Sequence, residues 1–140
     1  MAHWLMKSEP DVFGWPDLVK KGREEWHSVR NYTARNNMKA MKLGEESFFY
    51  HSNIGKEIVG IMKVVALAHP DSTAEPNDKG KIIWECVDVA PVKPFKRPVT
   101  LEEIKTTKGL EDMSLIKYSR LSVQPVTDKE WDIICKLGGV

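Results

Sequence analysis

The sequence predicts a single α+β domain over residues 1–140, in which five to six short strands form a partly closed barrel with short helices around it. The chain is long enough for one hydrophobic core, because 41% of its 140 residues are hydrophobic. Apolar runs rich in β-branched and aromatic residues recur between turn residues, which is typical of short strands. Several such strands in so small a chain favour a barrel over an open sheet.

Strands are expected over residues 3–8, 47–51, 58–67, 82–92 and 120–126. In the first strand, alternation places Trp4 and Met6 on one side and Leu5 on the other. The turn between the second and third strands contains Asn53 and Gly55, and residues 69–81 form a surface loop. The fourth strand is apolar on both faces, and we expect Pro91, Pro94 and Pro98 to end it.

Helices are expected between and after these strands. One covers residues 16–21 and ends at Gly22, and a second begins at Thr33 as its N-cap and stops at Gly44. Ala34, Met38 and Met41 recur at helical spacing on its buried side. Capping boxes begin two further helices, at Thr100–Glu103 and at Thr127–Glu130. The last helix has Val126 and Trp131 as a hydrophobic staple and stops at Gly138.

Charge is distributed unevenly along the chain. The formal net charge is only +1, which argues against a protein that grips nucleic acid of any sequence through a general basic surface. The segment from Lys20 to Lys42, however, carries seven basic side chains against Glu24 and Glu25. A local basic patch beside a cleft can steer an anion towards it.

Common catalytic and metal-binding patterns are missing from the sequence. It contains no G-x-S-x-G, H-E-x-x-H or phosphate-binding glycine motif, and its cysteines and histidines lack zinc-ligand spacing. We therefore expect no metal, no cofactor and no catalytic residue, with Cys86 and Cys135 as buried free thiols. Without a signal peptide or membrane segment, a cytoplasmic monomer that does not contact membranes is expected.

The strongest candidate for a binding site is the stretch VRNYTARNN, residues 29–37, which follows Trp26. A tryptophan beside polar residues suits stacking on a flat ring, although it could equally be half-buried and close the barrel. Asn31 can bond the edge of a base or cap the following helix. The guanidinium groups of Arg30 and Arg35 can bind phosphate, although Arg30 could instead pair with Glu9 or Glu25. Trp4 and Trp84, which lie in expected strands, are expected to pack in the core.

Four sequence blocks resemble the EVE-domain family. These are WLMKSEP near the start, W-x-x-VRNYTARN, MKLGEESFFYHSN and, near the end, RLSVQP, and together they extend over nearly the whole chain. The resemblance implies a PUA-like pseudo-barrel related to the YTH domains that bind methylated adenine in RNA. It also implies a protein that takes a modified base, chiefly a modified cytosine in DNA, out of the stack into a pocket.

Carried over by motif, the resemblance implies a base pocket and a phosphate-binding rim. The pocket would contain Lys7, Ser8 and Glu9 of KSEP, Trp26 as a stacking wall, Val29, Asn31 and Tyr32 of VRNY, and Tyr50, His51 and Ser52 of FYHS. The rim would use Arg30, Arg35, Lys39 and Lys42. The segments between KSEP and Trp26 and after Pro70 are shorter than in eukaryotic members, so the resemblance does not extend to their grip on duplex DNA or to their choice of modification.

Three alternatives remain open at this stage. The modified base could belong to RNA, as the resemblance to YTH domains suggests. The protein could be an enzyme acting on modified nucleosides, with Glu9 or His51 as acid or base, or with Ser8, His51 and Asp11 or Asp88 as a triad. Finally, it could be a protein–protein interaction module whose pocket is vestigial.

Overall fold

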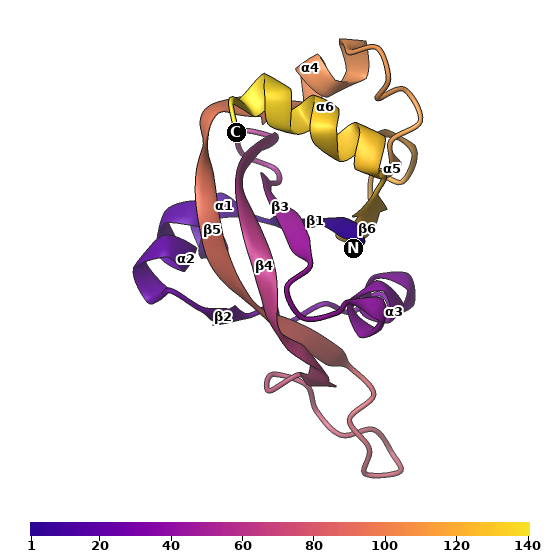
Figure 1. Cartoon of the computed structure of the whole chain (residues 1–140). Coiled ribbons are helices and arrows are strands. Elements are labelled where there is room, and N and C mark those ends of the chain that lie inside the picture. Colours follow the sequence, from indigo (N-terminus) through magenta and orange to yellow (C-terminus); the bar gives the residue numbers. More distant parts are fainter.

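A computed structural model describes all residues, 1–140, and contains a mixed six-stranded sheet with helices on both of its faces (Figure 1). The strands are β1 (His3–Ser8), β2 (Glu24–Glu25), β3 (Glu46–His51), β4 (Glu57–Pro70), β5 (Glu85–Thr100) and β6 (Val123–Val126). The helices are α1 (Pro10–Phe13), α2 (Trp15–Lys21), α3 (Tyr32–Ala40), α4 (Leu101–Thr106), α5 (Ser114–Lys117) and α6 (Asp128–Gly138). The predicted α+β class is therefore confirmed.

The sheet has the order β2-β5-β4-β3-β1-β6, so β2 and β6 are its edges and the barrel does not close. Only β1 and β3 are parallel, and every other neighbouring pair is antiparallel. The expectation of uniformly short strands was wrong for β4 and β5, which have 14 and 16 residues. These two strands form a long hairpin whose far end projects from the rest of the molecule (Figure 1).

The prolines of β5 do not end the strand as predicted. The reason is that β2 pairs only with Asp88 and Val89, so the rest of β5 is an edge on that side. A proline lacks the N–H donor, and an edge strand or a bulge tolerates its loss. Pro91 and Pro94 lie opposite Met62 and Gly60, where the β4–β5 register shifts twice. The prediction also began the strand too early, because Ile82–Trp84 precede β5.

Each face of the sheet has its own hydrophobic cluster, as the alternation in β1 predicted. Trp4 and Met6 belong to one cluster with Phe49, and α2 and α3 cover this face with side chains such as Leu18 and Met38. The opposite cluster contains Leu5 and Phe48 of the same strands, and it is covered by α4, α5 and α6. The sheet is thus the middle layer of three.

The helix boundaries differ from the prediction in ways that follow from capping. The N-cap of α3 is Asn31, whose side chain accepts a hydrogen bond from the Ala34 amide at 2.9 Å, and Thr33 lies inside the helix. This helix ends at Ala40, before Gly44. The Thr127–Glu130 capping box is confirmed, but α6 includes Gly138, and Gly139, with φ +74°, is its C-cap. The Thr100 side chain caps α4. The Glu103 side chain pairs with Arg97 and does not accept from the Thr100 amide, so the predicted capping box is only half formed.

Three short elements were not predicted: α1, β2 and α5. Each is too short for its hydrophobic residues to repeat with the period of a helix or a strand, so its sequence cannot be distinguished from that of a loop. Two of them matter for the site, because α1 and β2 lie on opposite sides of the pocket described next. No helix in the structure has the length and apolar composition needed to cross a membrane.

Candidate functional site

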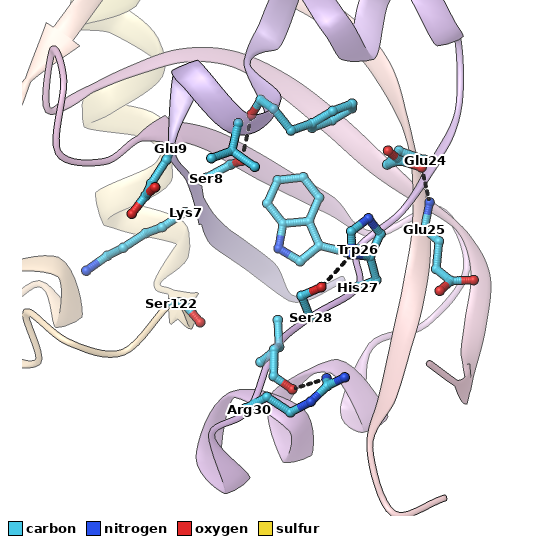
Figure 2. A pocket seen from close by; sticks show the side chains of 13 residues that line it. Lys7, Ser8, Glu9, Glu24, Glu25, Trp26, His27, Ser28, Arg30 and Ser122 are labelled. Atoms are coloured by element: carbon cyan, nitrogen blue, oxygen red, sulfur yellow. Dashed lines mark hydrogen bonds between the residues drawn. The ribbon is translucent and has the colours of Figure 1, made fainter. Parts of the chain in front are cut away.

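A pocket of about 470 Å³ opens on the face of the sheet that α2 and α3 cover. This volume lies within the range of pockets that hold small organic groups. Figure 2 shows the indole ring of Trp26 at its centre, between Ser8 on one side and Ser28 and Arg30 on the other. The lining comprises Lys7, Ser8, Glu9, Val12, Phe13, Glu24, Glu25, Trp26, His27, Ser28, Val29, Arg30 and Ser122.

Trp26 is more buried than we would expect from the polar residues that surround it in the sequence. It is only 6% exposed and belongs to the core cluster, where it makes a T-shaped contact with Phe49, with 5.4 Å between the ring centroids and 85° between the planes. Its backbone N–H donates to the Val87 carbonyl at 2.8 Å, which extends the pairing of β2 with β5. The ring is therefore a buried wall of the pocket, which favours the second of the two alternatives left open by the sequence, a tryptophan packed into the fold.

The loop after Trp26 is held in an unusual conformation by Asp71. Ser28 has φ +70°, which is rare for a residue other than glycine. The Asp71 carboxylate accepts from the Ser28 amide at 2.7 Å and from Arg30 Nη1 at 3.0 Å. Its other oxygen accepts from the amide and hydroxyl of Thr73 at 2.7 and 2.6 Å. These four donors fix the loop that forms the pocket wall.

The surroundings of Asp71 keep it ionised. Burial opposes its charge, but hydrogen bonds from Thr73, Ser28 and Arg30 outweigh burial and lower the pKa of the carboxyl to about 2. The pairing of Arg30 with Asp71 replaces the predicted alternatives, Glu9 and Glu25. Sequence reasoning missed Asp71, although Asp-Ser-Thr after a strand is a turn-forming sequence that could have indicated a backbone-binding carboxylate.

The KSEP block lines the pocket, but its polar groups have partners within the chain. The Ser8 hydroxyl donates to the Phe13 carbonyl at 2.6 Å (Figure 2). Glu9 accepts from Asn53 Nδ2 at 2.6 Å. Lys7 points away from Trp26 in Figure 2 and donates to the Ser119 carbonyl at 2.7 Å. Partial burial lowers the pKa of the Lys7 ammonium.

The FYHS residues lie outside the pocket, contrary to the prediction. Tyr50 belongs to the cluster on the opposite face of the sheet. The amide of Ser52 donates to the Ser8 carbonyl at 2.9 Å. His51 accepts from the Trp15 amide at 3.0 Å, and burial lowers its pKa. The side chains of Ser8 and His51 both bond the backbone of the α1–α2 turn. They do not make the hydrogen bonds that the suggested triad with Asp11 or Asp88 requires.

Asn31 and Tyr32 also lie outside the pocket that Trp26 lines. Asn31 caps α3 and lies on a second depression of about 520 Å³, together with Thr33 and the 117–121 segment. Tyr32 is 59% exposed and stacks on Trp84 at 5.0 Å between ring centroids. Trp84 was expected in the core, but it is only half-buried because it precedes β5.

The four candidate phosphate-binding cations are not equally available. Arg30 lines the pocket, but Asp71 offsets its charge. Arg35 donates to Asn36 Oδ1 and to the Ile83 carbonyl at 3.1 Å, and neither acceptor is charged. Lys39 lies 3.5 Å from Glu85, and Lys42 is exposed beyond the end of α3. Of the four, Arg30 is the one that lines the pocket, and Arg35 is the one whose charge no nearby carboxylate offsets.

The surface of the pocket is mostly apolar, and its charged residues do not make it basic. Glu9, Glu24 and Glu25 contribute three carboxylates to its lining, against the cations of Lys7 and Arg30. The apolar part consists of Val12, Phe13, Val29 and Trp26. Such a lining favours a neutral flat group with hydrogen-bond donors over an anion.

One cluster resembles a metal site. Single ligand atoms of Glu25, His69 and Cys86 lie within 4.8 Å of one another, which the sequence spacing did not indicate. However, His69 Nε2 bonds Asp88 at 2.7 Å, and a Glu25 oxygen accepts from Ser72 at 2.6 Å. Burial raises the pKa of the Cys86 thiol, which keeps it neutral. These contacts make it a hydrogen-bonded cluster between β2, β4 and β5.

Comparisons with known proteins identify the family of the chain. The EVE domain model matches residues 2–137. Thymocyte nuclear protein 1 from Homo sapiens is 41% identical, and the alignment covers 97% of this chain and 73% of that protein. A crystal structure of a protein from Agrobacterium tumefaciens has a TM-score of 0.94 and 49% identity, and the match covers 100% of this chain and 94% of that one.

A further solved structure bears on function. The human THYN1 protein in complex with 5-methylcytosine-containing DNA has a TM-score of 0.87 and is 37% identical, and the match covers 100% of this chain and 99% of that chain. Both the length of the family match and the identity to relatives agree with the four sequence blocks. The chain belongs to the EVE-domain family.

Proposed function

We propose that this protein binds nucleic acid by holding one modified base, a modified cytosine in DNA, in the pocket that Trp26 lines, and that it performs no chemistry on the base. The observation that carries the proposal is the buried Trp26 ring in a pocket of about 470 Å³ whose surface is mostly apolar and not basic. It is supported by the human family member whose structure contains 5-methylcytosine DNA.

The pocket lining matches the chemistry of 5-methylcytosine. An extruded base loses its stacking, and an aromatic ring restores about 1–3 kcal/mol per base. The exocyclic amino group of cytosine is a donor that carboxylates accept, and Glu9, Glu24 and Glu25 lie in the lining. A methyl group gains from contact with apolar side chains such as Val12, Phe13 and Val29.

The charge distribution supports a weak, base-dependent grip on the strand. Phosphates would lie outside the pocket, near Arg35, Lys39 and Lys42, because the pocket has more carboxylates than cations. Flipping a paired base costs a few kcal/mol, and a chain of net charge +1 gains little from general attraction to phosphate. The protein is therefore expected to prefer a base that is unpaired or weakly stacked, and to bind it as a monomer.

A binding screen tests the proposal. DNA and RNA oligonucleotides that carry the same single modification, with unmodified controls, are titrated at two salt concentrations. We expect a modified cytosine in DNA to bind tightest, and the ratio of modified to unmodified affinity to persist at high salt, because phosphate attraction is screened and base contacts are not. Equal affinity for modified and unmodified strands would contradict the proposal, and preference for RNA would reassign the polymer.

A further inference from the structure

A group of stacked planar side chains lies beside the pocket. Tyr32, the first residue of α3, stacks on Trp84 with centroids 5.0 Å apart and an angle of 30° between the planes. The Arg30 guanidinium carbon lies 5.6 Å from the Trp84 ring centroid. That of Arg35 lies 5.0 Å from the Tyr32 ring centroid and 5.8 Å from that of Trp84. We call these four residues the aromatic platform.

The platform is exposed chiefly at Tyr32, while Trp84 and Arg35 are half-buried, and it carries net positive charge. Tyr32 is 59% exposed although it is aromatic, and no apolar cluster includes it. Arg35 is held by two uncharged acceptors, so its charge is not neutralised by an ion pair. Lys39, which follows Arg35 by one helical turn, adds a second cation, partly offset by Glu85 at 3.5 Å. Planar rings beside unneutralised guanidinium match a ligand that combines a flat ring with an anion.

The platform is joined to the pocket through Arg30. This side chain lines the pocket, and its guanidinium also lies against Trp84. The same loop, Val29–Tyr32, therefore runs from the pocket wall to the exposed ring. A strand with one nucleotide in the pocket would place the neighbouring nucleotide near this surface, because the two are covalently linked.

We propose that the aromatic platform stacks the base of a nucleotide adjacent to the one held in the pocket, while Arg35 and Lys39 bind phosphate of the same strand. This inference rests on the proposed function for the position of the strand, but stacking on Tyr32 does not depend on modification. Every base has a flat face, so the platform contributes affinity without sequence preference. In this arrangement the platform strengthens binding to any strand, and the pocket recognises the modification.

The experiment compares two variants at one ring. Tyr32→Leu removes the aromatic face, and Tyr32→Phe retains it and loses only the hydroxyl. Each is titrated calorimetrically with single-stranded DNA pentamers that have 5-methylcytosine or cytosine at the centre, and with 5-methyldeoxycytidine monophosphate. Thermal melts confirm folding, which an exposed side chain should not disturb.

We expect Tyr32→Leu to weaken both pentamers by about tenfold, which is the size of one lost stacking contact, and Tyr32→Phe to stay within about twofold of the original. The ratio between the two pentamers and the affinity for the mononucleotide should not change. Unchanged pentamer binding by Tyr32→Leu would overturn the platform, as would failure of the unaltered protein to bind either pentamer.

Failure of the proposed function has a different signature. If the pocket does not distinguish the modification, the two pentamers bind equally, but Tyr32→Leu still weakens both. A surface that serves a protein partner is also distinguishable. If a pentameric acidic peptide with a central tyrosine binds as tightly as the pentamers and loses affinity in Tyr32→Leu, the platform belongs to a peptide partner and the nucleotide assignment is overturned.

Discussion

Two tryptophans of this protein have the same exposure but different surroundings. Trp26 and Trp131 are each 6% exposed, and each contacts one of the consecutive residues Phe48 and Phe49 of β3, on opposite faces of the sheet. Trp131 lies between Phe48, at 3.9 Å, and His3, at 4.2 Å, with both rings nearly parallel to it. Trp26 contacts Phe49 with the two ring planes nearly perpendicular, and it lines a pocket.

Equal burial does not mean that the two tryptophans have the same role. Both faces of the Trp131 ring are covered by neighbouring rings, so its contribution is to stability. Trp26 is held as firmly by its backbone and by Phe49, but part of its surface forms the wall of a preformed pocket. A fixed aromatic wall needs no reorganisation when a flat ligand arrives, which favours binding.

The largest expected effect separates the two tryptophans by stability. Trp131→Ala leaves a closed cavity under α6 and should lower the free energy of unfolding by about 3–5 kcal/mol. Trp26→Ala should cost less, because it enlarges a pocket that already exists instead of creating a void. Urea unfolding of both variants measures this. Equal losses would mean that Trp26 is an ordinary core residue.

The next effect concerns the loop that positions Trp26. Asp71→Asn should lower the free energy of unfolding by about 2 kcal/mol at neutral pH, because the charged acceptor for four donors is lost. The exposed Asp78 in the same loop is the control, and Asp78→Asn should have little effect. A loss in Asp71→Asn no larger than in the control would show that the loop holds its shape without this carboxylate.

The stability that Asp71 contributes should depend on pH. Its pKa is lowered from 3.8 to about 2 in the folded protein, so its stabilising contribution is complete above about pH 4 and is lost as the pH falls towards 2. The stability difference between the original protein and Asp71→Asn should therefore shrink over that window. Unfolding experiments at several pH values check it, and a difference that stays constant down to pH 2 would contradict the assignment.

A smaller effect is expected at His69, on the far side of the same loop. Its hydrogen bond to Asp88 raises the pKa of the imidazole above 6.5, although partial burial opposes the shift. A raised pKa means that the stabilisation is present at pH values below 6.5 and is lost as the pH rises through the folded-state value. An NMR titration measures the pKa directly. In Asp88→Asn it should fall, and an unchanged value would contradict the pairing.

The sequence was most informative where residues act through local rules. Alternation in His3–Ser8 correctly separated Trp4 and Met6 from Leu5, because the two faces of a strand follow from its period. The capping box at Thr127 and Glu130 was also predicted, because it depends on residues three positions apart. Where partners are local, the pattern contains the information.

The sequence was least informative where distant segments meet. Asp71 lies 43 residues from Ser28, and nothing near either residue indicates that they bond. Tyr50 was assigned to the pocket by its place in a motif. Because successive residues of a strand point to opposite faces, it lies on the face opposite to that of Phe49. The prolines of β5 broke a local rule that holds for central strands, and only the sheet order shows that this stretch is an edge.

In the proposed function Trp26, unlike Trp131, contacts the modified base. The most direct measurement is the ratio of affinities for two single-stranded oligonucleotides that differ only by one methyl group on cytosine, determined for Trp26→Phe and Trp131→Phe under conditions where both variants are folded. We expect the ratio to fall towards one in Trp26→Phe, because the smaller ring covers less of the base, and to be unchanged in Trp131→Phe. An unchanged ratio in Trp26→Phe, or the same loss in both variants, would contradict this expectation.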